Sequence, residues 1–340
     1  MTTSTGLRCC VVLPAHNEGR HIATVARGIP DWVAGIVIVD DASTDDTLEA
    51  ARAAAADDAR ITVLHHEKNR GVGGAMATGF MAAYEGGFDV AIKMDGDGQM
   101  DPAELPALVR PLELGMAEYA KGNRFRRSGR PDSMPATRWI GNVLLSFLTK
   151  VASGYWHVFD PQCGFLAIRT SLLPRLHLET IDRDYFFENA MLIRLNVLDA
   201  RVVDVDTSSL YGDEVSGLRI GHVSATFPLR LARGFIWRFV KRHVVNDFGL
   251  IAFLAVVGAL LAAFGLGFGA YHWIQSASAG VLTPTGTVML AVAPLIVGVQ
   301  MVLQALSLEV QDSPGAAETR DYARIRSRGD DARPASIGTP

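Results

Sequence analysis

The residues best suited by type and spacing to do chemistry are Asp95 and Asp97, in the segment Asp95-Gly96-Asp97-Gly98-Gln99. Two carboxylates two residues apart, with glycines between and after them, can approach a hard divalent cation without steric hindrance. Mg²⁺ or Mn²⁺ takes few protein carboxylates in such a site and completes its shell with water and phosphate oxygens. The pattern therefore indicates a Mg²⁺ or Mn²⁺ site that would neutralise a diphosphate leaving group. A solvated turn is the alternative.

A second acidic pair, Asp40 and Asp41, opens a segment rich in Ser, Thr and Asp. Ser43 or Thr44 can cap a helix there, with Asp45 in the first turn. Capping does not need the first two acids. We therefore expect one of these two carboxylates to accept hydrogen bonds from a nucleobase or a ribose.

The elements that must position these acids are predicted by alternating patterns between Cys9 and about Phe125. The short apolar runs are Cys9–Leu13, Gly35–Val39, Ile61–Leu64, Val90–Met94 and Tyr119–Ala120, and the helical segments include Thr44–Ala56 and Gly74–Tyr84. This alternation predicts an α/β domain with a mostly parallel sheet covered on both faces. Ligands of open α/β sheets bind beyond the carboxyl ends of the strands. Both acidic pairs follow such runs directly, as does the segment Pro14–Glu18, which favours a functional site.

A glycine-rich run, Arg70-Gly71-Val72-Gly73-Gly74, resembles a phosphate-binding loop only superficially. It follows the third predicted strand, Met76 stands where a dinucleotide fingerprint needs its third glycine, and a Walker lysine is absent. Close packing of a helix on the sheet is the better interpretation.

Composition excludes some classes of protein. The formal net charge of −4 gives no reason to expect nucleic acid as a partner. The cysteines are Cys9, Cys10 and Cys163. Their spacing does not match a zinc site or a disulfide framework, so we expect buried thiols in a reducing compartment.

The stretch between Asp247 and Glu309 contains no Asp, Glu, Lys or Arg. Within it, Gly249–Ile274 and Thr287–Leu308 are each long enough to span a bilayer core of roughly 30 Å. The sequence predicts a transmembrane hairpin; two buried helices of a soluble core are the alternative. A channel or transporter is disfavoured because neither span carries a charged residue.

Basic residues flank the predicted hairpin on both sides, and the turn between the spans has none. They are Arg230, Arg233, Arg238, Lys241, Arg242, Arg320, Arg324, Arg326 and Arg328. The positive-inside rule predicts an integral membrane protein with both termini cytoplasmic, in the inner membrane if the cell is bacterial. Leu229–His243 is amphipathic and is expected to lie on an anionic membrane surface, an ordinary surface helix being the alternative. The polar tail after Glu309 is expected to be disordered.

Six stretches resemble glycosyltransferase family 2, with its nucleotide-binding GT-A fold. Between about residues 9 and 170 they are VVLPAHNEG, IVIVDDASTDDT, NRGVGGAMATGF, IKMDGDGQMDP, YAKGNRF and DPQCGFLAIR. The resemblance implies donor-binding roles for Pro14, Glu18, Asp40, Asp41, Asp95, Gly96 and Arg124. It also implies Asp95, Asp97 and Gln99 as metal ligands, with Asp97 essential to catalysis.

Within the family, the two late spans and the DGDGQ form look most like polyprenyl-phosphate (dolichol-phosphate-type) sugar transferases. That subgroup shows Arg-x-x-Gly-x-Ser-Lys after the catalytic domain, whereas this chain has Tyr211 and Gly217 at the basic positions. Arg124, Arg138 and the basic residues between Arg230 and Arg242 are the substitutes, and we assign the acceptor phosphate to Arg138. The Gln-x-x-Arg-Trp motif of processive synthases is absent.

A catalytic base is needed only for a hydroxyl acceptor, because a phosphate acceptor is already ionised near pH 7. Glu188 lies where hydroxyl-acceptor members carry Glu-Asp and is the first candidate; Asn189 stands in place of the second acid. Asp160 and the pair Asp213/Glu214 are the other candidates.

The sequence thus predicts a GT-A domain over residues 1–215, a juxtamembrane helix over 216–247, a hairpin over 248–308 and a disordered tail over 309–340. We expect inverting transfer from a UDP- or GDP-sugar to a polyprenyl phosphate. Transfer to a hydroxyl of a lipid-linked glycan is the alternative reaction, and a non-catalytic membrane scaffold is the alternative class. A homo-oligomer is compatible with the sequence.

Overall fold

The computed structural model of the chain describes residues 6–124, 136–207 and 220–331. It divides into two units. The first consists of Met1–Phe235 together with Pro314–Pro340, and the second is Ile236–Ser313.

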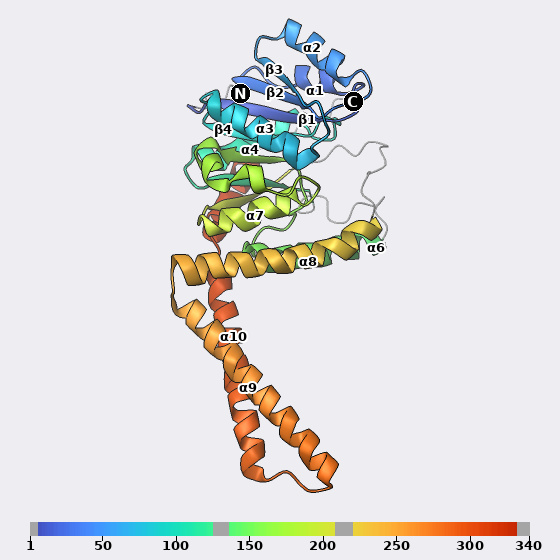
Figure 1. Cartoon of the computed structure of the whole chain (residues 1–340). Helices are drawn as coiled ribbons and strands as arrows, with labels where there is room; N and C mark the ends of the chain where they lie inside the picture. Colours follow the sequence, from blue (N-terminus) through green and yellow to red (C-terminus); the bar gives the residue numbers. More distant parts are fainter. Residues whose placement is uncertain (1–5, 125–135, 208–219, 332–340) are drawn as a thin grey trace. The chain divides into compact units, whose positions relative to one another are not determined.

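The first unit is built on a seven-stranded sheet of order β3-β2-β1-β4-β6-β5-β7 (Figure 1). The strands are β1 (Cys9–Ala15), β2 (Gly35–Asp40), β3 (Ile61–His65), β4 (Val90–Lys93), β5 (Tyr119–Asn123), β6 (Leu166–Arg169) and β7 (Val202–Asp206). Only β6 runs antiparallel to its neighbours, β4 and β5. The predicted mostly parallel sheet is confirmed.

Helices cover both faces of this sheet, because successive residues of a strand point to opposite sides. They are α1 (Ile22–Arg27), α2 (Thr47–Asp57), α3 (Val72–Glu85), α4 (Leu105–Glu113), α6 (Ala136–Ser153) and α7 (Phe187–Val197). In β1, Cys10 and Val12 join the core under α3 and α7, whereas Cys9, Val11 and Leu13 join the core under α1, α2 and α4. All three cysteines are free and buried, as predicted.

The glycine-rich run packs closely, but against a loop and not against the sheet. A Cβ on Gly73 would lie 2.2 Å from the carbonyl oxygen of Asp182, and the Gly73 amide donates to the Arg183 carbonyl at 2.9 Å. The glycine that lets α3 approach the sheet is Gly79, whose Cβ would lie 2.3 Å from Val12 Cγ1.

The tail predicted to be disordered instead forms α11 (Ala316–Asp331) within the first unit. Tyr322 is only 4% exposed, and its hydroxyl donates to the Ala107 carbonyl at 2.7 Å. The hydroxyl oxygen of Thr319 accepts from the Asp204 amide of β7 at 3.3 Å. The prediction was wrong for these residues because composition does not reveal that one helix face fits a folded surface. Residues 332–340 lie outside the described part of the chain.

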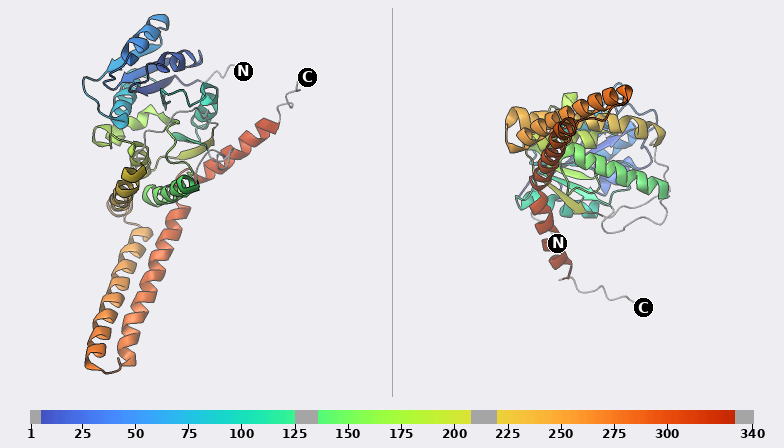
Figure 2. Two further views of the ribbon diagram at one scale, coloured as in Figure 1. Left: turned by 90° about the vertical axis from the view of Figure 1, so that its right-hand side faces the viewer. Right: turned by 90° about the horizontal axis from the view of Figure 1, so that it is seen from below.

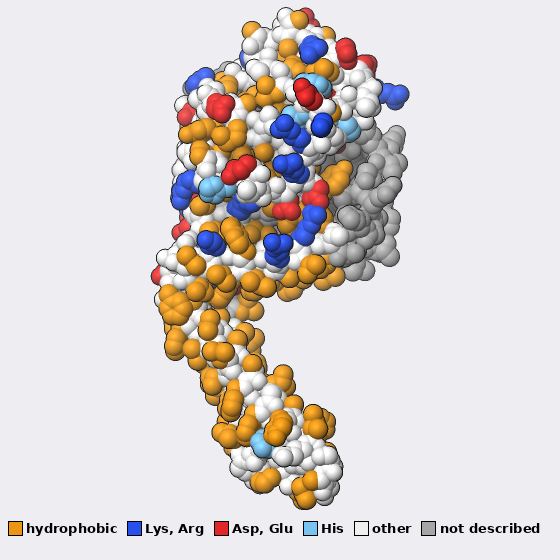
Figure 3. All heavy atoms as spheres, in the orientation of Figure 1, with side chains coloured by type: hydrophobic (Ala, Val, Ile, Leu, Met, Phe, Trp, Pro, Cys, Tyr) orange, Lys and Arg blue, Asp and Glu red, His pale blue; other side chains and the backbone are white. Residues whose placement is uncertain are grey.

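The second unit contains α9 (Leu250–Ala279) and α10 (Thr285–Gln311), two helices long and apolar enough to cross a membrane. They run side by side, as Figure 1 and the left view of Figure 2 show. Glycines bring their backbones together, since a Cβ on Gly258 would lie 2.8 Å from the Gly298 carbonyl oxygen. Most of their apolar surface is exposed within this chain (Figure 3), unlike the helices of a soluble core.

The segment expected over 216–247 is divided between the units at Phe235/Ile236. It comprises α8 (Ile220–Phe239) and a π-helical stretch, Val240–Asn246. Arg238 belongs to the predicted amphipathic helix Leu229–His243, whose basic residues are expected at an anionic membrane surface, but its side chain is 0% exposed and forms an ion pair with Glu309 of α10. That part of the predicted amphipathic pattern was wrong, because the hairpin supplies a partner that periodicity cannot show.

Candidate active site

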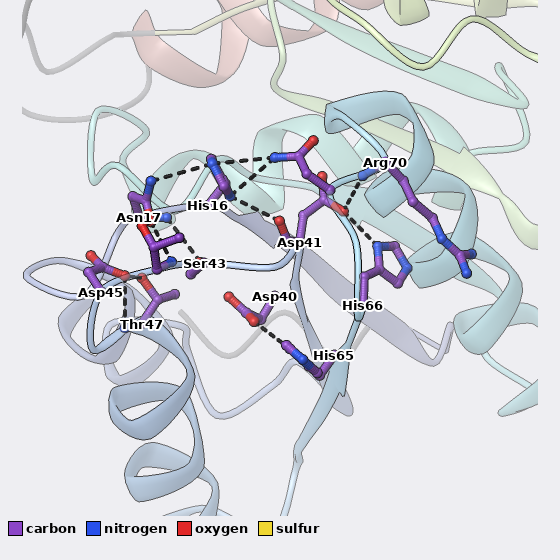
Figure 4. Close-up of polar contacts among 12 residues, drawn as sticks. His16, Asn17, Asp40, Asp41, Ser43, Asp45, Thr47, His65, His66 and Arg70 are labelled. Atoms are coloured by element: carbon purple, nitrogen blue, oxygen red, sulfur yellow. Dashed lines mark hydrogen bonds and ion pairs between the residues drawn. The ribbon is translucent and has the colours of Figure 1, made fainter.

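The loops after β1 and β2 are held together by side chains of both (Figure 4). Asn17 has φ +60°. Its backbone amide donates to Ser43 Oγ at 3.0 Å, and its side-chain oxygen accepts from the Thr44 backbone amide at 2.9 Å. The Glu18 amide donates to Thr47 Oγ1 at 2.8 Å. The Ser/Thr segment therefore does more than begin α2, since it fixes the loop that carries Glu18.

Asp40, the last residue of β2, and Asp41, which follows it, are both buried and paired with consecutive histidines at the end of β3 (Figure 4). His65 Nδ1 lies 2.7 Å from Asp40 Oδ2, and His66 Nδ1 lies 2.7 Å from Asp41 Oδ1. The Arg70 backbone amide also donates to Asp41 Oδ1, at 2.8 Å. In each pair the imidazole thus meets a carboxylate oxygen through Nδ1.

His16 also belongs to this cluster, with its Nδ1 2.9 Å from the Asp41 carbonyl oxygen. The sequence reasoning singled out neither His65 nor His66 and gave His16 no role. One signal was available: His65 and His66 directly follow the predicted strand Ile61–Leu64, at the sheet edge where ligands bind.

The segment Asp95–Gln99 follows β4 at the same edge as the loop after β1. A Cβ on Gly96 would lie 3.4 Å from the Pro14 carbonyl oxygen and 3.8 Å from Glu18 Cγ, so the two segments lie next to each other. Gly98 has φ +77°, a conformation that favours glycine. It turns the chain so that the Gln99 amide donates to Asp97 Oδ1 at 2.9 Å.

Asp95 is joined to a buried lysine, Lys93, the last residue of β4. Lys93 Nζ lies 2.9 Å from Asp95 Oδ1 and 2.8 Å from Glu188 Oε1. Burial alone would lower the pKa of Lys93, but the charges of Asp95 and Glu188 outweigh burial and raise this pKa above its ordinary value. Lys93 is therefore a permanent cation at the base of the site.

Glu188, the first candidate for a base, lies in the first turn of α7 and is buried. Its neighbour Asn189 is also buried; the Asn189 side-chain oxygen accepts from Thr149 Oγ1 at 3.1 Å and Gln162 Nε2 at 2.9 Å. Both side chains thus point into the protein, and Glu188 has a cation as its partner.

Arg124, which follows β5, is held by Asp160. Its Nε lies 2.7 Å from Asp160 Oδ2 and its Nη2 3.1 Å from Oδ1, the two-point geometry that suits a guanidinium and a carboxylate. Asp160 comes to this edge because β6 is antiparallel, with Leu166 paired to Lys93, so the residues before β6 lie beside the end of β4.

The donor set at Asp95 and Asp97 fits a divalent cation that shares its shell with a ligand. Among the described residues, no three His, Cys, Asp or Glu side chains form a metal-holding group. Mg²⁺ in phosphate-binding sites typically takes only one or two carboxylates, with phosphate oxygens and water completing the octahedron. Asp95 and Asp97 supply that number on a glycine-rich turn.

The remaining predicted residues are not placed. The side chain of Arg138 lies outside the described part of the chain, as do Tyr211, Asp213, Glu214 and Gly217. The structure thus brings together Pro14, Glu18, Asp40, Asp41, Asp95, Gly96, Asp97 and Gln99 at one edge of the sheet.

Comparison with known proteins finds a family model and relatives that match this chain. The model of glycosyl transferase family 2 matches residues 10–176. A UDP-N-acetylglucosamine–dolichyl-phosphate N-acetylglucosaminyltransferase of Methanococcus voltae is 33% identical over 176 residues, 48% of this chain and 70% of that protein. An undecaprenyl-phosphate mannosyltransferase of Micrococcus luteus is 30% identical over 202 residues, 58% of this chain and 82% of that protein.

A solved structure shares the fold. Glucosyl-3-phosphoglycerate synthase from Mycobacterium tuberculosis, in complex with UDP, superposes with a TM-score of 0.52 at 23% identity, over 68% of this chain and 80% of that chain. Fold and site together define a glycosyltransferase with the GT-A fold. The chain belongs to glycosyl transferase family 2.

Proposed function

We propose that this chain transfers a sugar from a nucleoside-diphosphate sugar to a polyprenyl phosphate at the cytoplasmic face of a membrane, with inversion at the anomeric carbon. The observation that carries the proposal is the close approach of Gly96 to Pro14 and Glu18. It brings the carboxylates suited to a diphosphate-bound cation next to the loops suited to a nucleoside.

Each part of the donor then has a set of residues at the sheet edge. The loops after β1 and β2, with Glu18, Asp40 and Asp41, hold the nucleoside. A divalent cation bound by Asp95 and Asp97, with Gln99 beside them, would offset the negative charge of the departing diphosphate. Arg124, kept in orientation by Asp160, faces the donor phosphates or sugar.

The acceptor is proposed from the membrane helices and from the relatives. Helices α9 and α10 would hold the catalytic unit at a lipid surface, and two relatives carry dolichyl-phosphate and undecaprenyl-phosphate in their names. A phosphate acceptor needs no general base. The burial of Glu188 beside Lys93 therefore favours this acceptor over a sugar hydroxyl.

A separate observation supports the proposed membrane topology of the hairpin. The first unit contains chain from before the hairpin and α11 from after it, and α11 donates to and accepts from that unit at Ala107 and Asp204. This supports the proposal that the chain segments on the two sides of the hairpin share one side of the membrane. The basic flanks favour the cytoplasm as that side.

The test is transfer by the purified full chain in detergent, with Mn²⁺, a panel of radiolabelled UDP- and GDP-sugars, and undecaprenyl phosphate as acceptor. We expect label in the lipid extract with one donor and none when undecaprenol replaces its phosphate. Arg138→Ala should reduce transfer about tenfold while donor binding changes less, as expected for one lost charge-assisted phosphate contact. Transfer that occurs only when a lipid-linked glycan is supplied as a second acceptor would contradict the proposed acceptor, and no transfer from any donor would favour a scaffold.

A further inference from the structure

Lys93, Asp95 and Glu188 form a chain of charges in which the lysine sits between two carboxylates. The Lys93 side chain is 3% exposed, that of Glu188 9% and that of Asp95 32%, so only Asp95 reaches the solvent. Asp95 binds Lys93 through Oδ1. The proposed cation site would thus share one of its carboxylates with a built-in ammonium group.

Gly164, just before β6, has no side chain and so leaves space for the Asp95 and Lys93 side chains. A Cβ at this position would lie 2.6 Å from Asp95 Oδ2 and 2.6 Å from Lys93 Nζ, closer than real contacts allow. The antiparallel pairing of β6 with β4 brings the glycine there. The space around Asp95 is therefore shaped by a second segment of the chain as well as by its own turn.

General physical chemistry gives no reason for folding to need these charges. Transferring ions into the protein interior is unfavourable, and replacing a buried ion pair by apolar side chains is often neutral or stabilising. Every other residue of β4 is apolar and buried (Val90, Ala91, Ile92), so an apolar side chain at position 93 would continue the core. The charged trio instead stands at the one end of β4 where ligand binding is expected.

We propose that Lys93 is a positioning residue that orients Asp95 for the divalent cation, and that Glu188 is the counter-ion that limits how strongly Lys93 competes with this cation. The proposal rests on the proposed function, which supplies the cation. The ammonium group of Lys93 and the cation both attract the Asp95 carboxylate. Glu188 draws the ammonium group away from Asp95, so neutralising Glu188 should leave more positive charge at the cation site.

Glu188→Gln separates this role from that of a general base. As a counter-ion, Glu188 controls cation affinity: the substitution should weaken Mn²⁺ binding about tenfold, the effect of one charge-assisted contact, and lower kcat less than about tenfold at saturating Mn²⁺. As a base, Glu188 would control proton transfer, which is typically worth a factor of 10² to 10⁴ in rate, and Mn²⁺ affinity would not change.

The experiment is a Mn²⁺ titration of the full chain in detergent, with free Mn²⁺ followed by electron paramagnetic resonance, alone and with UDP. Glu113→Gln is the matched control. This substitution also removes the charge of an acid that has a cationic partner, since Glu113 Oε2 lies 3.1 Å from Arg110 Nη1. The charge of Glu113, however, raises the pKa of Cys9, which lies at the opposite end of β1 from the proposed cation site. We expect wild-type Mn²⁺ affinity from this control and weaker binding from Glu188→Gln.

The double variant Lys93→Met/Glu188→Gln removes the competing ammonium group and its counter-ion together. We expect Mn²⁺ affinity at least equal to that of the wild type, with a reduced kcat because Asp95 has lost its support. This variant tests the proposal even if Glu188→Gln does not fold, since an unchanged kcat would contradict the positioning role.

Two failures are distinguishable. A wild-type protein that binds no Mn²⁺ would overturn the cation site and the inference with it. If the wild type binds Mn²⁺ and Glu188→Gln binds it equally well with little loss of kcat, the inference alone is overturned. A loss of about a hundredfold in kcat at saturating Mn²⁺ would overturn the inference and also indicate a general base, which contradicts the proposed phosphate acceptor.

Discussion

The guanidinium group of Arg124 and the carboxylate of Asp160 form a two-point ion pair, with Nε 2.7 Å from Oδ2 and Nη2 3.1 Å from Oδ1. Asp160 is 1% exposed, whereas about a third of the Arg124 side chain reaches solvent (34%). A buried acid therefore holds a partly exposed cation at the sheet edge where the donor would bind. The plane of the guanidinium group is fixed before any phosphate arrives.

Arg124 and Asp160 should behave as one unit in catalysis. We expect Arg124→Ala and Asp160→Asn each to lower kcat/KM for the donor about 10- to 100-fold, since each removes or misorients one charge-assisted contact. The kcat/KM of the double variant should be no lower than that of the less active single variant, because the effects of coupled residues are not additive. Steady-state kinetics of all four proteins measures the coupling. Strictly multiplicative losses would show that the two side chains act separately.

Activity should depend on a divalent cation at Asp95 and Asp97. We expect Asp97→Asn to abolish turnover with an unchanged unfolding temperature, because Asp97 is partly exposed and asparagine keeps an oxygen to which the Gln99 amide can donate. A chelator should abolish turnover reversibly, with recovery on adding Mn²⁺ or Mg²⁺. Asp57→Asn, at an exposed acid of α2, is the control. Full activity of Asp97→Asn in the presence of chelator would refute the cation site.

The stability of the protein should fall with rising pH through the titration of Asp204. Burial raises the pKa of Asp204 to about 7 from an ordinary value of 3.8, against the effect of the hydrogen bond from Asn123. The folded state then binds a proton that the unfolded state releases near pH 4. This contribution to stability is complete below pH 4 and is lost as the pH rises to 7.

Asp204→Asn removes that titration but keeps an oxygen for the Asn123 side chain to donate to. The unfolding temperature of the variant minus that of the wild type should increase by at least about 3 °C when the pH is raised from 4.5 to 8. Thermal unfolding at both pH values measures the difference, with Asp31→Asn as an exposed control. A constant difference across this range would mean that Asp204 is ionised throughout.

Both ends of the hairpin should lie in the cytoplasm. Reporter fusions after Asp213 and at Pro340 should both show cytoplasmic activity, whereas a reporter inserted near Ala279 should be external, because the turn between α9 and α10 lacks positive charge. Reporters active on opposite sides at the first two positions would rule out a hairpin.

Local sequence patterns were sufficient for the elements and for the location of the carboxylates. The run Val90–Met94 predicted β4, and the small residues around Asp95 and Asp97 marked its end as a ligand-binding edge. The same holds for Asp40 and Asp41 after β2. Side-chain periodicity and strand-end chemistry are properties of a few consecutive residues, so they can be read without knowing the fold.

The partners of these residues were decided by the tertiary structure. Lys93 and Glu188 are 95 positions apart, and only the packing of α7 beside the end of β4 brings them together. The antiparallel insertion of β6 between β4 and β5 places Asp160 beside Arg124 and Gly164 beside Asp95. Periodicity tells which face of an element is buried but not which distant segment covers it. For the same reason, the sequence did not show the burial of Arg238 against Glu309 or the docking of Tyr322, because each depends on a surface assembled from remote parts of the chain.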